Sequence, residues 1–202
     1  MRLLELFCGT KSVGNIFNDY DYEVLSIDIL EKFKPDVVTD ILDWDFKQYP
    51  PQYFDVIWAS PPCNTFSALR NCLKNSRAKW TQEKIDSDIL NIGLPILRRT
   101  EEIIDYFQPK YWFIENPQTG KMKNYIERTF FDVDYCQYGY DYRKRTRIWS
   151  NLELDVTKCN HKRHVSSIGR LGTQKTTLAQ RYSIPSLLIK SIIEKIISMG
   201  TI

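Results

Sequence analysis

The 202-residue chain lacks the features of a membrane or secreted protein. No apolar run approaches the ~20 residues that a membrane-spanning helix needs, and no signal-peptide pattern is present. The five cysteines are odd in number and widely spaced, and no C-x-x-C occurs, so they predict free thiols rather than a disulfide framework. We therefore expect a protein of a reducing compartment, the cytoplasm or nucleus, with no membrane partner.

Excess charge of one sign is also absent. Lys and Arg number 28 against 25 Asp and Glu, for a formal net charge of +3, so a wide basic surface is not predicted and only a local basic patch is. No internal repeat or low-complexity segment occurs. Hydrophobic content of 43% and charged content of 26% are ordinary for a soluble globular domain that can bury a core.

Strands alternate with helices over the first two thirds of the chain, which predicts a doubly wound, mainly parallel α/β sheet of seven strands. The tail differs, because residues 152–180 are polar and without clear periodicity, whereas an amphipathic helix follows Ile184-Pro185. Pro95 is expected to kink or divide the long helix before the fifth strand. The predicted strands are 2–7, 23–28, 36–39, 54–59, 111–114, 131–137 and 147–151. The predicted helices are one that opens from the turn 8–14 and ends at about residue 19, and those at 83–107, 119–129 and 184 onward.

The chain is organised around the stretch Ser60-Pro61-Pro62-Cys63, which follows a buried strand. Two prolines stop the strand and stiffen its exit, and they deliver a thiol where open α/β sheets bind ligands. A thiolate is a good nucleophile when positive charge lies nearby. The alternative is a buried structural cysteine, which is the commoner fate of a single cysteine.

A glycine turn, Cys8 to Gly14, links the first strand to a helix and places backbone N–H groups at the same edge of the sheet. Asp28 and Asp40 end the next two strands, where an acid can hydrogen-bond ribose hydroxyls. Together these features predict a nucleoside-bearing cofactor over the first three strands. The alternative is that both acids only cap loops.

Two further groups lie near the same edge. Glu115-Asn116-Pro117 follows the fifth strand and offers an acid or a hydrogen-bond partner for a heterocycle, or else a simple turn or salt-bridge residue. Arg143, Arg145 and Arg147 alternate onto one face of an extended segment. Their guanidinium groups can bind phosphates, fix a base or stabilise an ionised Cys63 thiol. The alternative is a solvated basic edge strand.

The segment from Cys159 to His164 contains three potential zinc ligands, Cys159, His161 and His164. No fourth ligand lies near them in the sequence. We therefore expect no metal site there, and instead a basic loop that contacts nucleic acid or is solvated.

These pieces, in this order, resemble the cytosine-C5 DNA methyltransferases, most closely the small versions found in large DNA viruses and bacteriophages. Leu4-Glu5-Leu6-Phe7-Cys8-Gly9-Thr10 is similar to the first cofactor motif of the family. Pro62-Cys63-Asn64-Thr65-Phe66-Ser67 resembles its Pro-Cys nucleophile box, and Glu115-Asn116-Pro117 its Glu-Asn-Val box. Tyr138-Gly139 with Arg145-Thr146-Arg147, and Arg181 to Pro185, resemble its later segments.

The resemblance implies S-adenosylmethionine-dependent methylation of carbon 5 of cytosine in DNA by a Rossmann-like domain, acting as a monomer or weak homodimer. It implies that Cys63 adds to carbon 6 of a flipped-out base, that Glu115 is the acid, and that Arg145 and Arg147 orient the base. The implied cofactor residues are Phe7, Cys8, Gly9, Thr10, Ser12, Val13, Asp28, Ile29, Asp40, Ile41 and Pro61, and the implied substrate residues are Pro62, Ser67, Asn116 and Arg143.

The chain departs from the family pattern in several places. Lys11 stands where a second glycine is usual, Pro117 replaces valine, and Arg143 stands where glutamine is common. We expect a catalytic domain over 1–151, a short irregular region over 152–180 in place of the large target-recognition domain, and a closing helix over 181–202. This leaves open the same chemistry on RNA or a free nucleotide, and a silent DNA- or partner-binding module. A dinucleotide oxidoreductase is a distant alternative, because Gly9 to Gly14 departs from G-x-G-x-x-G.

Overall fold

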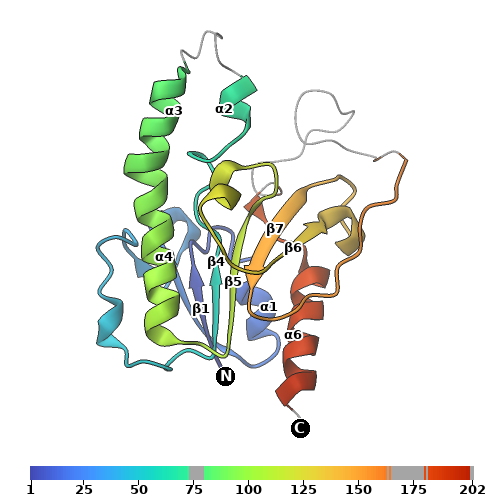
Figure 1. Cartoon of the computed structure of the whole chain (residues 1–202). Coiled ribbons are helices and arrows are strands. Elements are labelled where there is room, and N and C mark those ends of the chain that lie inside the picture. Colours follow the sequence, from blue (N-terminus) through green and yellow to red (C-terminus); the bar gives the residue numbers. More distant parts are fainter. Residues whose placement is uncertain (73–79, 163, 165–179, 181, 201–202) are drawn as a thin grey trace.

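A single seven-stranded sheet organises the chain (Figure 1). The computed structural model describes residues 1–72, 80–162, 164, 180 and 182–200. The strand order is β3-β2-β1-β4-β5-β7-β6, and β7 alone runs antiparallel to its neighbours, which confirms the predicted doubly wound, mainly parallel sheet. The strands are β1 (Arg2–Leu6), β2 (Glu23–Asp28), β3 (Val37–Val38), β4 (Val56–Ala59), β5 (Tyr111–Pro117), β6 (Phe130–Asp134) and β7 (Arg145–Ser150).

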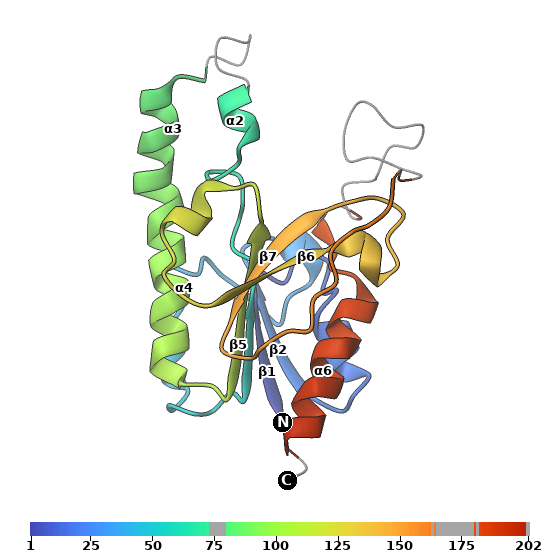
Figure 2. The same cartoon turned by 45° about the vertical axis from the view of Figure 1, so that its right-hand side comes forward.

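Helices cover both faces of the sheet (Figure 2). The helix α4 (Leu94–Phe107) packs on one face, and α1 (Gly14–Asn18) with α6 (Ser186–Gly200) packs on the other. The central strands are therefore apolar on both sides, and four of the five residues of β1 are buried. Within the described part of the chain, no helix combines the length and apolarity needed to cross a membrane.

The long helix beside β5 contains a π-helical turn. α3 (Gln82–Asp88) leads through η3 (Ile89–Gly93), a π-helix, into α4. Pro95 follows directly after this turn, at the first positions of α4. Proline lacks an N–H and crowds the carbonyl four residues earlier, and the wider turn relieves both problems. The expected kink at Pro95 is therefore a change of helix type.

Two local predictions were wrong. Residues 119–129 form only a short 3₁₀ turn, η4 (Lys121–Asn124), because the Lys121 amide donates to the Phe66 carbonyl at 2.8 Å instead of extending a helix. β6 ends at Asp134, and a 3₁₀ turn, η5 (Tyr135–Tyr138), follows it. After the loop that carries Cys63 comes a short helix, α2 (Leu69–Cys72).

The remaining segments agree with the predictions in outline. Residues 152–162 contain no helix or strand. α6 begins just after Pro185, and its buried isoleucines and leucine join the core cluster that contains Leu3 of β1 and Phe113 of β5. Residues 73–79, residues 165–179 of the polar stretch, and Arg181 lie outside the described residues.

Candidate active site

Cys63 lies in a short loop after β4, and two contacts fix that loop. The Asn116 Nδ2 atom, at the end of β5, donates to the Pro61 carbonyl at 2.8 Å, and both residues are buried. The Phe66 amide donates to the Cys63 carbonyl at 3.2 Å, which closes the turn. Pro62 is exposed and Cys63 is half-buried, so the fixed loop leaves the thiol partly covered.

The π-helical turn packs against the Thr65 and Phe66 side of this loop. A Cβ atom on Gly93 would lie 2.5 Å from Thr65 Oγ1 and 2.8 Å from the Phe66 ring, closer than real contacts allow. Phe66 is fully buried, so its ring has no free space to move into. Glycine at 93 therefore lets the long helix support the Cys63 loop. The loop ends at Ser67, whose Oγ accepts the Leu69 amide at 3.3 Å.

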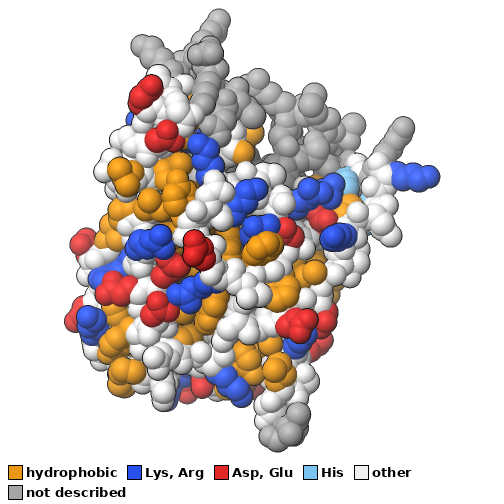
Figure 3. Space-filling model, in the orientation of Figure 1, with side chains coloured by type: hydrophobic (Ala, Val, Ile, Leu, Met, Phe, Trp, Pro, Cys, Tyr) orange, Lys and Arg blue, Asp and Glu red, His pale blue; other side chains and the backbone are white. Residues whose placement is uncertain are grey.

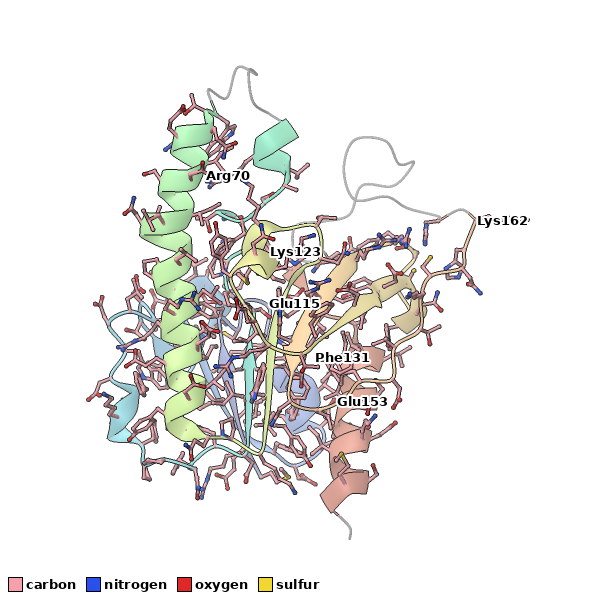
Figure 4. The ribbon with its side chains drawn as sticks, viewed as in Figure 1. Arg70, Glu115, Lys123, Phe131, Glu153 and Lys162 are labelled. Atoms are coloured by element: carbon pink, nitrogen blue, oxygen red, sulfur yellow. The ribbon has the colours of Figure 1, made fainter. Side chains whose placement is uncertain are left out.

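Glu115 lies at the carboxyl end of β5, the strand beside β4 (Figure 4). Its side chain is buried, with 7% of the residue exposed. The Tyr135 hydroxyl donates to Glu115 Oε1 at 3.2 Å. Burial raises the pKa of Tyr135 well above its usual value, so this hydroxyl keeps its proton and remains a donor.

Opposing effects act on the Cys63 thiol. Burial is the largest, and it raises the pKa of Cys63 above that of a free thiol, while the charge of Glu115 raises it further. The ammonium group of Lys144 lowers this pKa. At neutral pH the resting thiol is therefore mostly protonated, and its ionisation is favoured by Lys144 and by loss of charge on Glu115.

The register of β7 separates the predicted arginines from this pair. Glu115 lies opposite Ile148, so Arg147 and Arg145 point to the other face of the sheet. There Arg147 forms a bidentate ion pair with Asp132, at 2.7 and 2.9 Å, and its guanidinium lies 3.5 Å from the centroid of the Phe130 ring. The structure therefore does not bring Arg147 to the Cys63 and Glu115 side.

Arg143 and Arg145 share one acid on that same face. The Asp134 carboxylate lies 3.0 Å from Arg143 Nε and 3.6 Å from Arg145 Nε, and these ion pairs hold the pKa of Asp134 below its usual value, against the effect of burial. Lys144 alternates between them and lies on the side of Tyr135, with its Nζ 4.7 Å from that ring's centroid. Sequence analysis missed Lys144, although strand alternation alone separates it from its arginine neighbours.

The loop after β1 has an unusual backbone. Phe7, Gly9 and Lys11 have φ angles of 59°, 49° and 54°, in the left-handed region that favours glycine. Such a conformation is strained for phenylalanine and lysine, and strain of this kind clusters at ligand sites. A glycine at position 11, usual in the family that the loop resembles, would adopt this conformation without strain.

Asp28 holds this loop from the end of β2. Its Oδ2 accepts the Gly9 amide at 2.9 Å and its Oδ1 accepts the Leu30 amide at 2.8 Å. Each carboxylate oxygen keeps a second lone pair for a further donor. The neighbouring Ile29 is 59% exposed, an apolar side chain beside a carboxylate, which suits a planar heterocycle joined to a sugar.

Three further groups of the loop face different environments. Thr10 Oγ1 is buried and has no hydrogen-bond partner among the described residues, as expected of an atom that serves a ligand. Ser12 Oγ accepts the Ile184 amide at 3.0 Å, so the closing segment reaches this loop. Cys8 and Val13 are buried, and burial raises the pKa of the Cys8 thiol to about 12.

Asp40 and Ile41 belong to a loop that the long helix holds. Asp40 Oδ1 accepts the Leu42 amide at 2.9 Å, and Ile41 is buried. Arg99 of α4 donates to the carbonyls of Ile41, Leu42 and Trp44, at 3.1 to 3.2 Å. The long helix thus fixes the loop after β3.

Comparison with known proteins decides the family. A relative in Frog virus 3 (isolate Goorha), named "Probable DNA (cytosine-5)-methyltransferase", is 39% identical over 216 residues, which cover 96% of this chain and 99% of that protein. The chain belongs to the DNA (cytosine-5)-methyltransferase family. A relative in Methanocaldococcus jannaschii with the provisional name type II methyltransferase M.MJ0563P is 27% identical over 188 residues, 78% of this chain and 58% of its own length.

A solved methyltransferase structure agrees with the fold. The methyltransferase EhMeth of Entamoeba histolytica superposes with a TM-score of 0.52 at 17% identity, over 77% of this chain and 56% of its own. The chain thus spans about half the length of that methyltransferase. No protein-family model matches the chain.

Proposed function

We propose that this protein transfers a methyl group from S-adenosylmethionine to carbon 5 of cytosine in DNA. The observation that carries the proposal is the pairing of Cys63 and Glu115 at adjoining strand ends, tied together by the 2.8 Å hydrogen bond from Asn116 to Pro61. Membership of the DNA (cytosine-5)-methyltransferase family supports the reaction type. A nucleophile and an acid at neighbouring strand ends are what addition to a weakly electrophilic ring requires.

In the proposed reaction the Cys63 thiolate attacks carbon 6 of a cytosine that has left its stack, at a cost of a few kcal/mol. The S–C6 bond forms and the C5–C6 π electrons move to carbon 5. Carbon 5 then takes the methyl group, whose bond to the cofactor sulfur breaks with the electron pair left on that sulfur. A base removes the C5 proton. The C6–S bond breaks, and the C5–C6 double bond returns. Lys144 favours the thiolate at the start of this sequence.

Glu115 supplies the acid in this scheme. Held by the Tyr135 hydroxyl, it binds N3 and the exocyclic amine of the base and draws charge from the ring as sulfur attacks. Arg145 and Arg147 remain proposed base-orienting residues. For Arg147 this role requires exchange of the Asp132 ion pair for the substrate.

S-adenosylmethionine, when bound, supplies an electrophilic methyl group. The loop from Phe7 to Val13 would hold it, with Thr10 and the free lone pairs of Asp28 as hydrogen-bond partners. Ile29, Asp40 and Ile41 would take the adenosine end, and Pro61 would bound the methyl group. Calorimetry with S-adenosylmethionine tests this set, and Asp28→Asn should weaken binding, because a ribose hydroxyl then meets an amide.

DNA contact is proposed for the basic side chains around the amino end of β7. Figure 3 shows Lys and Arg side chains gathered over this end of the β6–β7 edge, near a histidine. Arg145 is more accessible than Arg143 and Arg147, with 46% of its side chain exposed, and it suits a phosphate. Pro62, Ser67, Asn116 and Arg143 are proposed to border the flipped base.

The experiment is methyl transfer from labelled S-adenosylmethionine to genomic DNA, bulk RNA and free cytosine nucleotides in parallel. We expect label in DNA as 5-methylcytosine, and its loss in Cys63→Ser. Label in RNA or nucleotide alone would keep the chemistry and overturn the DNA substrate. No label anywhere, together with no cofactor binding, would favour a binding module, and label retained in Cys63→Ser would overturn the mechanism.

A further inference from the structure

Four potential metal ligands from distant parts of the sequence meet at the outer edge of the sheet. Cys136 lies in η5, directly after β6, and Cys159, His161 and His164 lie in the segment after β7. One ligand atom from each residue, two sulfurs and two ring nitrogens, lies within 4.8 Å of all the others. Sequence analysis found three of these ligands, and the fold supplies the fourth.

The spacing fits a tetrahedron. With Zn–S bonds of about 2.3 Å and Zn–N bonds of about 2.0 Å, neighbouring ligand atoms of a tetrahedral site lie roughly 3.3 to 3.8 Å apart. Cys159 Sγ lies 3.6 Å from His161 Nδ1 and 3.3 Å from His164 Nε2. The two imidazole centroids are 5.4 Å apart, so both rings can point a nitrogen at one ion.

We propose that Cys136, Cys159, His161 and His164 bind a structural Zn²⁺ ion. Two soft sulfurs and two imidazoles select zinc over the oxygen-seeking Mg²⁺ or Ca²⁺. Four protein ligands fill a tetrahedral shell and leave no position for a reacting water, so the ion holds structure and takes no part in methyl transfer. His161 is exposed and the other three ligands are half-buried, so the ion can enter from solvent.

The surroundings support a built site. The Asp134 carboxylate accepts the Cys159 amide at 2.9 Å, so the acid that pairs with Arg143 and Arg145 also fixes the backbone of a ligand. The same segment is tied to α6, because Lys195 Nζ lies 2.8 Å from Asp155 Oδ2. Zinc would therefore join the start of region 152–180 to the β6 edge that carries the proposed DNA-contacting arginines.

The first test is the metal content of the untagged full chain, purified in reducing buffer without chelator. We expect about one zinc per chain. Cys136→Ser should lose the zinc, because it removes the ligand from the other side of the site. Cys63→Ser, a thiol outside the cluster, and Lys162→Ala, a non-ligating side chain within it (Figure 4), should keep it.

A second measurement covers the case in which a ligand variant fails to fold. Wild-type protein reloaded with Co²⁺ should show the ligand-field absorption of a tetrahedral, thiolate-bound ion. Zinc should protect Cys136 and Cys159 from alkylation until a chelator is added, with Cys63 unaffected.

Three results would overturn the proposal: wild-type protein with neither zinc nor a cobalt spectrum, full zinc content in Cys136→Ser, or a metal-free Cys136–Cys159 disulfide in protein purified without reductant. None of these readouts depends on methyl transfer, so they are independent of the proposed function.

Discussion

The parallel strands β1 to β4 and the antiparallel strand β7 present polar groups to the same edge of the sheet by different means. After β1, the polar groups are positioned by backbone conformation. Residues 7, 9 and 11 are left-handed, and the Asp28 carboxylate accepts the Gly9 amide. At β7, the polar groups are positioned by the alternation of side chains along the strand. Lys144 lies on the side of Glu115, whereas Arg145 and Arg147 pair with acids on the other side. A one-residue shift in register would exchange these sets and leave the β1 loop unchanged.

The largest expected effect lies at the junction of the two regions. Glu115→Gln removes the proposed acid and keeps the shape, so methyl transfer should fall by about 10²–10⁴-fold. Glu23→Gln, an exposed acid paired with Arg2, is the matched control and should keep full activity. Initial rates with labelled cofactor measure both. Equal rates in the two variants would remove Glu115 from the mechanism.

The second prediction concerns a buried acid beneath the β1 loop. Burial raises the pKa of Glu5 from 4.5 to about 8, although the Gly14 amide donates to it at 3.2 Å. A folded-state pKa above the unfolded value gives stability that is complete below about pH 4.5 and is lost as pH rises through about 8. The free energy of unfolding of Glu5→Gln, relative to the wild type, should therefore rise by about 2–4 kcal/mol across this window.

Urea unfolding at several pH values measures that difference. The difference in free energy of unfolding between Glu5→Gln and the wild type could instead stay constant from about pH 5 to about pH 8. That result would mean that Glu5 is ionised in the folded protein. Asp43→Asn, an exposed acid outside the core, provides the reference for general effects of charge.

Arg147→Met tests the antiparallel side. The change removes a bidentate ion pair and a ring contact and leaves Asp132 partly buried without this partner, so the free energy of unfolding should fall by about 1–3 kcal/mol. Arg98→Met, which removes an exposed pair with Glu101, should cost less than about 1 kcal/mol. Full stability with lost methyl transfer would instead show that Arg147 orients the base, as the family resemblance implies.

Lys144→Met and Arg145→Met compare the two faces of one strand directly. Only the first change should raise the pKa of Cys63 further, because only Lys144 acts on that thiol. Alkylation of Cys63 at neutral pH should then slow by up to about tenfold, the effect of one pKa unit, and Arg145→Met should leave it unchanged. Peptide mass spectrometry across a pH series measures both rates. Equal slowing would mean that net charge, not register, sets the reactivity.

The smallest effect is expected in the β1 loop. Lys11→Gly removes a left-handed non-glycine residue and should raise the free energy of unfolding by about 1 kcal/mol. Lys47→Gly, at a position without positive φ, should lower it. Thermal unfolding distinguishes the two. If both variants unfolded at a lower temperature than the wild type, the charge of Lys11 beside Glu5 would outweigh the strain of its backbone.

Sequence reasoning succeeded where one local pattern determines the structure. β2 is predicted to the residue, because Glu23–Asp28 is a short β-rich run between turns. It failed where a distant contact decides, as at residues 119–129, whose backbone binds Phe66 instead of forming a helix. The facing of Lys144 and the approach of Cys136 to His164 depend on pairing across strands, which no local spacing reveals.

The hydrogen bond from Ile184 to Ser12 spans 172 positions of the chain. During synthesis the loop after β1, the proposed cofactor loop, is therefore made well before the segment that binds it. A nascent chain that already contains β1 to β7 and both Cys63 and Glu115 still lacks this contact and the helix that packs beneath it. We therefore expect the affinity for cofactor to be acquired late, so that a ribosome-bound chain stays inactive until α6 has docked.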